Sequence, residues 1–407
     1  MKHEARGSEL DIETIPHLHP SKVRIFISTG EVSGDLQAAL LVEALKRQAT
    51  ASGLELEIVA LGGERMAKAG ATLLGDTTGI GSVGILETLP YVLPTLQMQR
   101  RAKEHLQQHP PDLVVLIDYL RPNLSIGSYI KHHLPDVPIV YYISPQQWVW
   151  SSSPQDTATI VRITNRLLAI FPEESRYYKD HGASSVSWVG HPLVDRIQGF
   201  PNREEARQAL GIKPEEMAIA LIPASRRQEL KYLLPVIFEA AQRLQTQLPQ
   251  AHFWIPLSLE AYRQPIEQAI QNYGLRATLI ADRTPEVLAA ADLAITKSGT
   301  VNLELALLNV PQVVIYRVSP LTAWIARNIL KFSISFMSPP NLVEMKPIVP
   351  ELLQEQASAE NIVTESLELL LNPQRRQQTL TDYEEMRRVL GEVGVCDRAA
   401  REILQML

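Results

Sequence analysis

The sequence predicts an α/β protein of two domains, each built on a parallel β-sheet. The chain has 407 residues, which is more than one typical domain requires. Short apolar segments alternate with helical segments, and this alternation favours parallel strands joined by right-handed crossovers. The alternation restarts after about residue 201, so we expect a second sheet there and a junction near residues 191–203.

The expected strands are short segments rich in β-branched or continuously apolar residues. The clearest is 112–118, whose unbroken apolar run between two aspartates is typical of a strand buried on both faces. In chain order, the expected strands are 23–28, 57–61, 112–118, 138–143, 166–170, 217–222, 252–257, 277–280, 293–296 and 312–316. We assign residues 1–21 to a disordered tail, 22–200 to the first domain and 201–373 to the second.

Composition and charge argue against several classes of protein. Hydrophobic residues make up 45% and charged residues 21% of the chain, as in ordinary soluble domains. A net charge of −6 gives no basic excess, so we expect no nucleic-acid partner. Cys396 is the only cysteine and cannot form an internal disulfide. The N-terminus has no secretory signal and no apolar run is long enough to span a bilayer, so we expect a cytoplasmic protein, with peripheral membrane binding left open.

One strand end in the second half is suited to an anion. Ser298, Gly299 and Thr300 lie between an expected strand and a helix, where glycine allows close approach and free N–H groups favour negative charge. Glu304 follows about one turn later, where its carboxylate could accept hydrogen bonds from ribose hydroxyls. An ordinary helix cap followed by a first-turn acid explains the same pattern.

A second strand end in the same half carries Ser225 and Arg226. The planar donor fork of arginine suits phosphate oxygens, so this pair could bind a diphosphate. A surface arginine in a loop is the alternative. Ligands of open α/β sheets bind beyond the carboxyl ends of the strands, so two such strand ends in one domain strengthen the functional interpretation of both.

The first half carries candidate acids at two strand ends. The turn at 30–35 does not match the G-x-G-x-x-G fingerprint, which argues against a nicotinamide dehydrogenase. We expect Glu31 to point into the cleft between the domains; a tight turn with Asp35 as a helix cap is the alternative. Asp118 ends the most apolar strand, where partial desolvation would raise its pKa towards that of a general base. A capping aspartate is the alternative there.

Other segments have both a functional and a structural interpretation. His191 lies at the domain junction, where a structural role competes with a catalytic one. The aromatic segment 144–150 could line a sugar or acyl site or form a packed cleft wall. The apolar segment 83–96 is followed by Arg100, Arg101 and Lys103, a combination that suits an anionic bilayer surface, and 324–332 has a similar character. A core helix is the alternative for both apolar segments.

Taken together in order, these motifs resemble the lipid-A-disaccharide synthase family from about Val23 to the C-terminus. No single motif is decisive, but their order and spacing are highly specific. The matching segments are 30–35, 62–66, 83–87, 117–118, 142–145, 148–150, 189–192, 223–226, 298–300, 303–304, 338–342 and 350–353.

The resemblance implies a GT-B fold, with two Rossmann-like domains, an active site between them and C-terminal helices at 374–407 that pack back onto the first domain. It implies an inverting transferase that joins UDP-2,3-diacylglucosamine to 2,3-diacylglucosamine 1-phosphate (lipid X), forming a β-1,6 disaccharide 1-phosphate and UDP. It implies no metal and no cofactor, since the UDP-sugar is a substrate, and a peripheral location on the inner membrane. The oligomeric state is left open, with a homodimer among the options.

The resemblance also assigns roles by position. It implies that Asp118 is the base, with Glu31 beside it at the acceptor and Arg226 stabilising the leaving UDP. The expected substrate-binding residues are Ser225, Ser298, Gly299, Thr300, Glu304, Asn341, Ser33 and His191. The expected acyl- and membrane-binding residues are Ile85, Leu86, Leu89, Val92 and Leu93.

The chain departs from the family pattern mainly on the acceptor side. Arg121 replaces an acid found in many relatives, Ser151 an arginine, Glu173 a phenylalanine and Ala224 a glycine. Two alternatives stay open on this evidence. One is another GT-B enzyme of UDP-sugars, such as a UDP-N-acetylglucosamine transferase or 2-epimerase, and the other is a non-catalytic membrane-surface protein.

Overall fold

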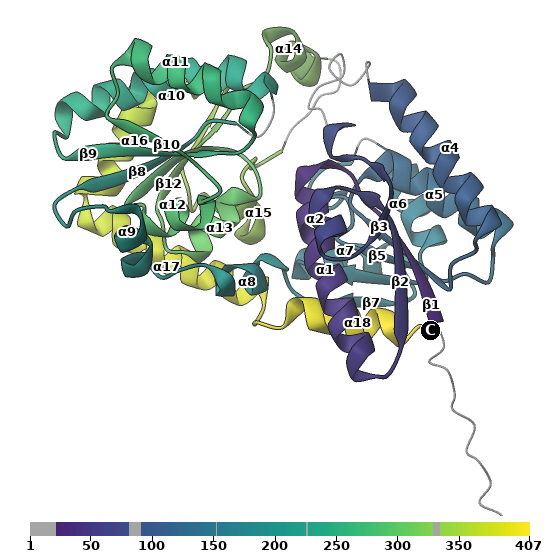
Figure 1. The fold of residues 1–407 in the computed structure, drawn as a ribbon. Coiled ribbons are helices and arrows are strands. Elements are labelled where there is room, and N and C mark those ends of the chain that lie inside the picture. Colours follow the sequence, from purple (N-terminus) through teal and green to yellow (C-terminus); the bar gives the residue numbers. More distant parts are fainter. Residues whose placement is uncertain (1–21, 81–90, 152, 225–226, 329–333) are drawn as a thin grey trace, which may run out of the picture.

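The computed structural model describes residues 22–80, 91–151, 153–224, 227–328 and 334–407. They form two α/β domains that lie side by side (Figure 1). One domain has a seven-stranded sheet and the other a six-stranded sheet, and every pairing between strands is parallel. The predicted fold class is therefore confirmed. The expected tail and the candidate residues Ser225, Arg226, Ile85, Leu86 and Leu89 lie outside the described residues.

The N-terminal domain has the strand order β3-β2-β1-β4-β5-β6-β7. Its strands are β1 (Lys22–Ser28), β2 (Glu55–Gly62), β3 (Thr72–Asp76), β4 (Leu113–Ile117), β5 (Ile139–Tyr142), β6 (Arg166–Ala169) and β7 (Val186–Trp188). Its helices are α1 (Glu31–Ala51), α2 (Glu64–Lys68), α4 (Val92–Gln108), α5 (Leu120–His133), α6 (Pro154–Ile163) and α7 (Pro172–Asp180).

The C-terminal domain has the strand order β10-β9-β8-β11-β12-β13. Its strands are β8 (Met217–Ile222), β9 (Ala251–Leu257), β10 (Ala277–Ala281), β11 (Leu293–Lys297), β12 (Gln312–Tyr316) and β13 (Glu351–Leu353). Its helices are α9 (Arg203–Leu210), α10 (Arg227–Gln247), α11 (Arg263–Tyr273), α12 (Thr284–Ala290), α13 (Val301–Leu307), α14 (Pro320–Asn328), α15 (Pro339–Glu344) and α16 (Ala359–Leu371).

Helices cover both faces of each sheet. In the N-terminal domain, buried side chains of α1 share one hydrophobic core with the sheet, while those of α4, α5 and α6 form a core on the opposite face. The C-terminal sheet is enclosed in the same way, by α10, α11 and α16 on one face and α9 and α12 on the other. Burial on both faces explains why every residue of β4 is apolar and inaccessible.

Three strands were not expected from the sequence. β3, β7 and β13 are short and lie at the edges of their sheets, with only one fully buried residue among them. An edge strand is covered by fewer neighbours, so its sequence shows no continuous apolar run and no clear alternation. Tertiary pairing, rather than a local pattern, makes these segments strands.

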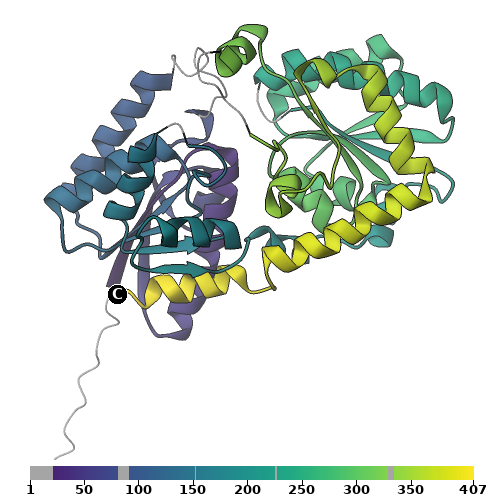
Figure 2. The ribbon, with the colours of Figure 1, turned by 180° about the vertical axis from the view of Figure 1, so that it is seen from behind.

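Two connections between the domains lie next to each other. One is the segment with α8 (Leu193–Arg196), and the other joins α17 (Pro373–Leu390) to α18 (Val395–Leu404). Gly190 has a φ of 91°, and a Cβ there would lie 2.8 Å from the carbonyl oxygen of Leu390. The backbone N–H of His191 donates to that same oxygen at 2.8 Å. Figure 2 shows α17 running along the C-terminal domain and α18 continuing onto the N-terminal domain.

Contacts between the two connections fix the return of the chain to the N-terminal domain. The Asp195 carboxylate accepts the backbone N–H groups of Gly394 at 2.6 Å and Cys396 at 2.7 Å, which caps the start of α18. Buried residues of α18 then share the hydrophobic core of α1. The C-terminal helix is therefore an integral part of the N-terminal domain's core.

Candidate active site

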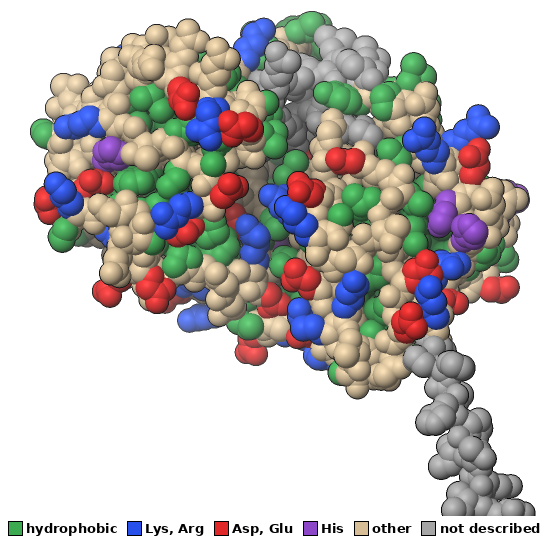
Figure 3. Space-filling model, in the orientation of Figure 1, with side chains coloured by type: hydrophobic (Ala, Val, Ile, Leu, Met, Phe, Trp, Pro, Cys, Tyr) green, Lys and Arg blue, Asp and Glu red, His purple; other side chains and the backbone are tan. Residues whose placement is uncertain are grey.

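The candidate residues gather where the direction of strand connection reverses in each sheet. In the N-terminal sheet this point lies between β1 and β4, and Glu31 and Asp118 follow those two strands. In the C-terminal sheet it lies between β8 and β11, and Ser298 follows β11. Ligands of open α/β sheets bind at such points, beyond the carboxyl ends of the strands. The space-filling view shows a hollow between the two domains (Figure 3).

The end of β1 is shaped by close contacts between backbone and side chains. A Cβ at Gly30 would lie 2.3 Å from the ring of Tyr119, so only glycine lets that ring pack here. Glu31 has a left-handed φ of 62°, and its backbone N–H donates to the carbonyl oxygen of Thr77 at 3.4 Å. Asp35 does not cap its own helix: it accepts N–H groups of Gly63 and neighbouring residues and so caps α2.

The end of β4 holds Asp118 in an unusual backbone conformation. Asp118 and Tyr119 have consecutive positive φ angles of 43° and 51°. The N–H of Asp118 donates to Ile143 at 2.8 Å, and its carbonyl accepts the Tyr141 hydroxyl at 2.8 Å. Non-glycine residues in this region cost energy and persist where the surroundings hold them, most often at functional sites.

Asn123 is the centre of the hydrogen bonds that hold this turn. It is fully buried, and its side-chain N–H groups reach the carbonyls of Ile117 at 3.0 Å and Asp118 at 2.8 Å. Its side-chain oxygen accepts the Ser28 hydroxyl at 2.7 Å, which ties the ends of β1 and β4 together. Sequence reasoning missed Asn123. The available signal was a lone amide on the otherwise apolar buried face of α5.

The environment of Asp118 is suited to a general base. Burial among protein atoms raises its pKa from 3.8 to about 6, the nearby Glu31 charge adds to the rise, and the Tyr119 backbone N–H opposes it. The residue is nevertheless exposed to solvent, so water screens part of this effect. A bound acceptor would exclude that water and strengthen the desolvation further.

A buried glutamate supports the neighbouring strand ends. Glu174 accepts the backbone N–H of Ser144 at 3.0 Å, the Ser144 hydroxyl at 2.5 Å and the N–H of Ile170 at 2.8 Å. Burial raises the pKa of Glu174 to about 7, and these hydrogen bonds oppose the rise. Glu174 therefore fixes the start of the aromatic segment 144–150.

His191 lies within a packed aromatic group rather than in open solvent. Its ring centroid is 5.4 Å from that of Phe171, which is in turn 5.7 Å from the ring of Trp148. Burial lowers the pKa of His191 to about 3, so the ring is neutral at physiological pH. Its Nδ1 accepts the N–H of Leu193 at 3.2 Å, which places the ring proton on Nε2.

In the C-terminal domain, Ser298 connects three segments. Its backbone N–H donates to Ile315 in β12 at 3.1 Å, and its hydroxyl donates to the Met337 carbonyl at 2.9 Å. The N–H of the next residue, Gly299, donates to the Asn302 side chain at 2.7 Å. Asn302 is fully buried and also bonds Gln312. Thr300 precedes the first residue of α13. The buried side-chain amides of Asn302 and Gln312 thus fix the loop at 298–300.

Glu304 is paired with the interdomain connection. Its Oε1 accepts Nε of Arg196, in α8, at 2.6 Å, and the two side chains are 8% and 25% exposed. A ribose contact would therefore use the other carboxylate oxygen. The pair joins the predicted nucleotide site to the chain that links the domains, a contact that no local pattern indicated.

Asn341 is buried and its side chain is occupied by structural hydrogen bonds. Its Oδ1 accepts the Val349 N–H at 2.8 Å, and its Nδ2 donates to Val349 at 2.9 Å and to Glu351 at 2.8 Å. Glu351 also accepts the N–H groups of Met337 and Ser338 at 2.9 and 2.7 Å. The structure thus places Asn341 beneath the segment that contacts Ser298. Any contact of this region with a nucleotide sugar would come from the segment that Asn341 supports.

Comparison with known proteins then identifies the family. The model of the lipid-A-disaccharide synthetase family matches residues 25–405. The chain is 62% identical over 382 residues to the lipid-A-disaccharide synthase of Gloeothece citriformis, covering 94% of this chain and 99% of that protein. It is 56% identical over 385 residues to that of Synechocystis, covering 94% and 98%. This chain belongs to the lipid-A-disaccharide synthase family.

Membership of the family makes the chain a glycosyltransferase, as the sequence predicted. Solved structures share its GT-B fold. Staphylococcus aureus MnaA with UDP has a TM-score of 0.65 at 16% identity, covering 95% of this chain and 98% of that one. MurG of Acinetobacter baumannii has a TM-score of 0.52 at 14% identity, covering 94% and 99%. Identities this low show the fold alone, whereas the synthases match at 46–62% identity over nearly the whole chain, so the 2-epimerase and non-catalytic alternatives are not favoured.

Two departures from the family pattern have structural partners in this family member. The Arg121 guanidinium pairs with the largely buried Asp156 in α6 at 3.0 Å, so the exchanged residue bridges α5 and α6. The Ser151 hydroxyl donates to the Gln147 side chain at 2.6 Å, within the aromatic segment. Ser33, which was expected to bind substrate, lies half-buried in the first turn of α1.

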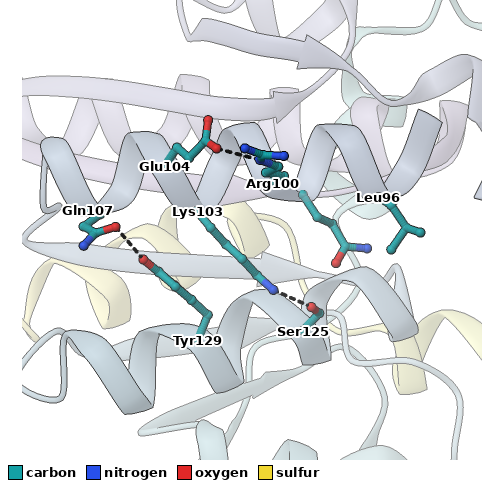
Figure 4. A pocket seen from close by; sticks show the side chains of 8 residues that line it. Leu96, Arg100, Lys103, Glu104, Gln107, Ser125 and Tyr129 are labelled. Carbon is teal, nitrogen blue, oxygen red and sulfur yellow. Dashed lines mark hydrogen bonds and ion pairs between the residues drawn. The ribbon is translucent and has the colours of Figure 1, made fainter. Parts of the chain in front are cut away.

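The start of α4 exposes apolar side chains, and a groove between α4 and α5 follows. Val92 and Leu93 are 43% and 70% exposed. Further along, from Leu96 to Gln107, α4 lines a groove of about 340 Å³ together with α5 (Figure 4). Across it, the Lys103 ammonium donates to the Ser125 hydroxyl at 2.8 Å. Among the described residues, no helix is both long and apolar enough to cross a bilayer.

Proposed function

We propose that this glycosyltransferase transfers 2,3-diacylglucosamine from UDP-2,3-diacylglucosamine to lipid X, forming the β-1,6 disaccharide 1-phosphate and UDP. Family membership supports the reaction class. The observation that carries the proposal is Asp118, which lies at the sheet's switch point on a strained, hydrogen-bonded turn with a raised pKa. A carboxylate that ionises near pH 6 can accept a proton at neutral pH without being too weak a base.

The chemical step begins at the acceptor's 6-hydroxyl. Asp118 takes the proton as the hydroxyl oxygen forms a bond to the anomeric carbon of the donor, and the bond from that carbon to the diphosphate breaks. The base is in the N-terminal domain and the nucleotide is assigned to the C-terminal domain, so attack and departure occur on opposite faces and the anomeric carbon inverts. Glu31, whose charge raises the pKa of Asp118, lies beside the acceptor in this scheme.

The departing UDP gains negative charge, which the C-terminal domain would stabilise. Arg226 and Ser225 would bind the diphosphate, together with Ser298, Gly299 and Thr300 at the start of α13. Directed donors of this kind contribute about 3 kcal/mol each to transition-state stabilisation in other enzymes. In this scheme they replace a divalent ion, and no cofactor takes part. Glu304, oriented by Arg196 at 2.6 Å, would accept ribose hydroxyls.

The lipid substrates would be collected at the inner-membrane surface. The exposed Val92 and Leu93 support this, together with Ile85, Leu86 and Leu89 of the neighbouring segment and the basic residues that follow in α4. Replacing Leu86, Leu89 and Val92 by serine should move the protein from the membrane fraction to the soluble fraction. Unchanged partitioning between the two fractions would contradict peripheral binding at this segment.

The decisive experiment is incubation of the purified protein with UDP-2,3-diacylglucosamine and lipid X. We expect disaccharide 1-phosphate and UDP in equal amounts, without added metal and in the presence of a chelator. UDP-N-acetylglucosamine serves as the control donor and should yield neither the disaccharide nor a 2-epimer. Failure to form the disaccharide with both authentic substrates would refute the proposal.

A further inference from the structure

We propose that helix α14 (Pro320–Asn328) binds the acyl chains of the lipid-linked sugar donor. The inference rests on the proposed function, because it requires a donor whose sugar carries long acyl chains. It assigns to the C-terminal domain a lipid-binding element of its own, separate from the apolar start of α4.

Helix α14 exposes two large apolar side chains. Leu321 and Trp324 are 53% and 55% exposed, and their spacing of three residues places them on the same face of the helix. Of the α14 side chains that the structure describes, none is buried. An ordinary surface helix turns its apolar stripe towards the core and its polar residues towards water. The packing of the C-terminal domain therefore does not account for these side chains.

The helix nevertheless has a well-defined beginning. Ser319 precedes Pro320, and its hydroxyl oxygen accepts the backbone N–H of Thr322 at 3.1 Å, as in a helix N-cap. A helix of nine residues is marginal in water without packing against something. A capped, short, apolar helix at the surface is what a bound hydrophobic ligand would stabilise.

The position of α14 indicates which ligand this is. The segment that contains α14 leaves the sheet at the end of β12 and returns at Met337. Ser298 holds both ends: its N–H donates to Ile315 at 3.1 Å and its hydroxyl donates to Met337 at 2.9 Å. Both ends of the segment that contains α14 are therefore bonded to Ser298, the residue assigned to the donor's diphosphate. In the proposed donor, the acyl chains are attached to the sugar that the diphosphate carries, so they begin within a few bonds of this point.

The arrangement of the two domains agrees with this assignment. Figures 1 and 2 both show α14 and the start of α4 on the same side of the molecule, across the gap between the domains. Donor chains held by α14 and acceptor chains held near Val92 and Leu93 would thus face one common lipid surface. Tryptophan is favoured where an apolar surface meets water, which suits Trp324 at that boundary.

The test uses the full-length protein with Leu321 and Trp324 both replaced by serine. In a detergent-dispersed assay we expect the KM for UDP-2,3-diacylglucosamine to rise roughly tenfold, because contact with two large apolar side chains is lost. The inhibition constant for UDP should not change, since UDP has no acyl chains. The conservative variant Leu321→Met with Trp324→Phe should restore most of the affinity for the donor.

Leu371→Ser is the matched control, because Leu371 is 59% exposed at the end of α16 and belongs to no proposed site. An unchanged donor KM in the double serine variant, with active wild type, would overturn the inference. So would reduced binding to phospholipid vesicles with an unchanged donor KM, because α14 would then meet the bilayer instead. If the wild type forms no product, the proposed function fails, whereas donor and UDP affinities measured by calorimetry still test α14 by itself.

Discussion

The two strand-end regions that face each other across the domains are built differently. In the N-terminal domain, non-glycine residues with positive φ follow β1, β4 and β5, at and beside the switch point: Glu31, Asp118 and Ile143. Among the described residues of the C-terminal domain, the non-glycine residues with positive φ that follow strands are Asp282 and Gln354, after the outer strands β10 and β13. In the part of the chain that the structure describes, strained non-glycine residues thus lie at the switch point of the N-terminal sheet but only at the outer strands of the C-terminal sheet.

The charges around the candidate acids also differ between the two domains. Asp118 is near another carboxylate, Glu31, and its pKa is raised to about 6. Glu304, its counterpart across the cleft, is paired with Arg196 at 2.6 Å. An acid beside another carboxylate has a raised pKa that suits proton transfer, whereas an acid paired with a cation is held in one orientation, which suits ligand binding. This difference supports the proposed scheme, in which the N-terminal domain supplies the base and the C-terminal domain binds the nucleotide.

The largest expected effect comes from Asp118→Asn. Loss of a general base should lower kcat by about 10²- to 10⁴-fold, because asparagine cannot accept the proton. The dissociation constant for UDP, measured by calorimetry, should stay the same. Loss of both UDP affinity and turnover would contradict the assignment of base and nucleotide site to separate domains. Full retention of activity would contradict the role of Asp118 as the base.

Asn123 and Asn302 are a matched pair of buried amides, one in each domain. Asn123→Ala and Asn302→Ala each remove a fully buried side chain that holds a strand-end turn. Each should lower the free energy of unfolding by about 1–3 kcal/mol, because backbone carbonyls or N–H groups lose their partners. The functional losses should separate: Asn123→Ala should lower kcat, while Asn302→Ala should weaken UDP binding. Steady-state kinetics and UDP titration check this, and identical losses in both variants would contradict it.

Arg196→Ala tests the link between the proposed nucleotide site and the interdomain connection. It leaves Glu304 buried without its cation, and because Arg196 is partly exposed we expect a loss of about 2 kcal/mol in unfolding free energy. UDP affinity should also fall. Arg203→Ala is the control, since Arg203 forms a more exposed pair with Asp292 and should cost at most about 1 kcal/mol. Denaturant unfolding of both variants measures these losses. Equal losses of unfolding free energy in the two variants would contradict a special role for Arg196.

The smallest effect concerns pH. The base must be ionised, so kcat/KM should fall as the pH drops below about 6, the pKa of Asp118. The folded state holds this proton more tightly than the unfolded state, whose pKa is near 3.8, so the contribution of Asp118 to stability falls as the pH rises from about 4 to 6. Asp118→Asn should therefore be slightly more stable than the wild type at pH 7, with the difference vanishing near pH 4. Thermal unfolding over this range would reveal the opposite trend if Asp118 were stabilised as an anion.

Local sequence determined much of the architecture. The run at 112–118 predicted β4 because a strand covered on both faces has no room for polar side chains. The positions of Glu31, Asp118 and Ser298 after strands predicted that they lie at carboxyl edges, and the order of the motifs predicted the family. These conclusions depend on periodicity and order, which the sequence displays directly.

Only the tertiary structure decided which side chains meet. Asn123 bonds Ser28 across 95 positions, Arg196 reaches Glu304 across 108, and Asp35 caps α2 rather than its own helix. The edge strands β3, β7 and β13 likewise exist because a neighbour pairs with them. Apolar periodicity reports that a segment is buried, but a hydrogen bond between distant side chains depends on how the buried segments are oriented against each other, and that orientation has no local signature.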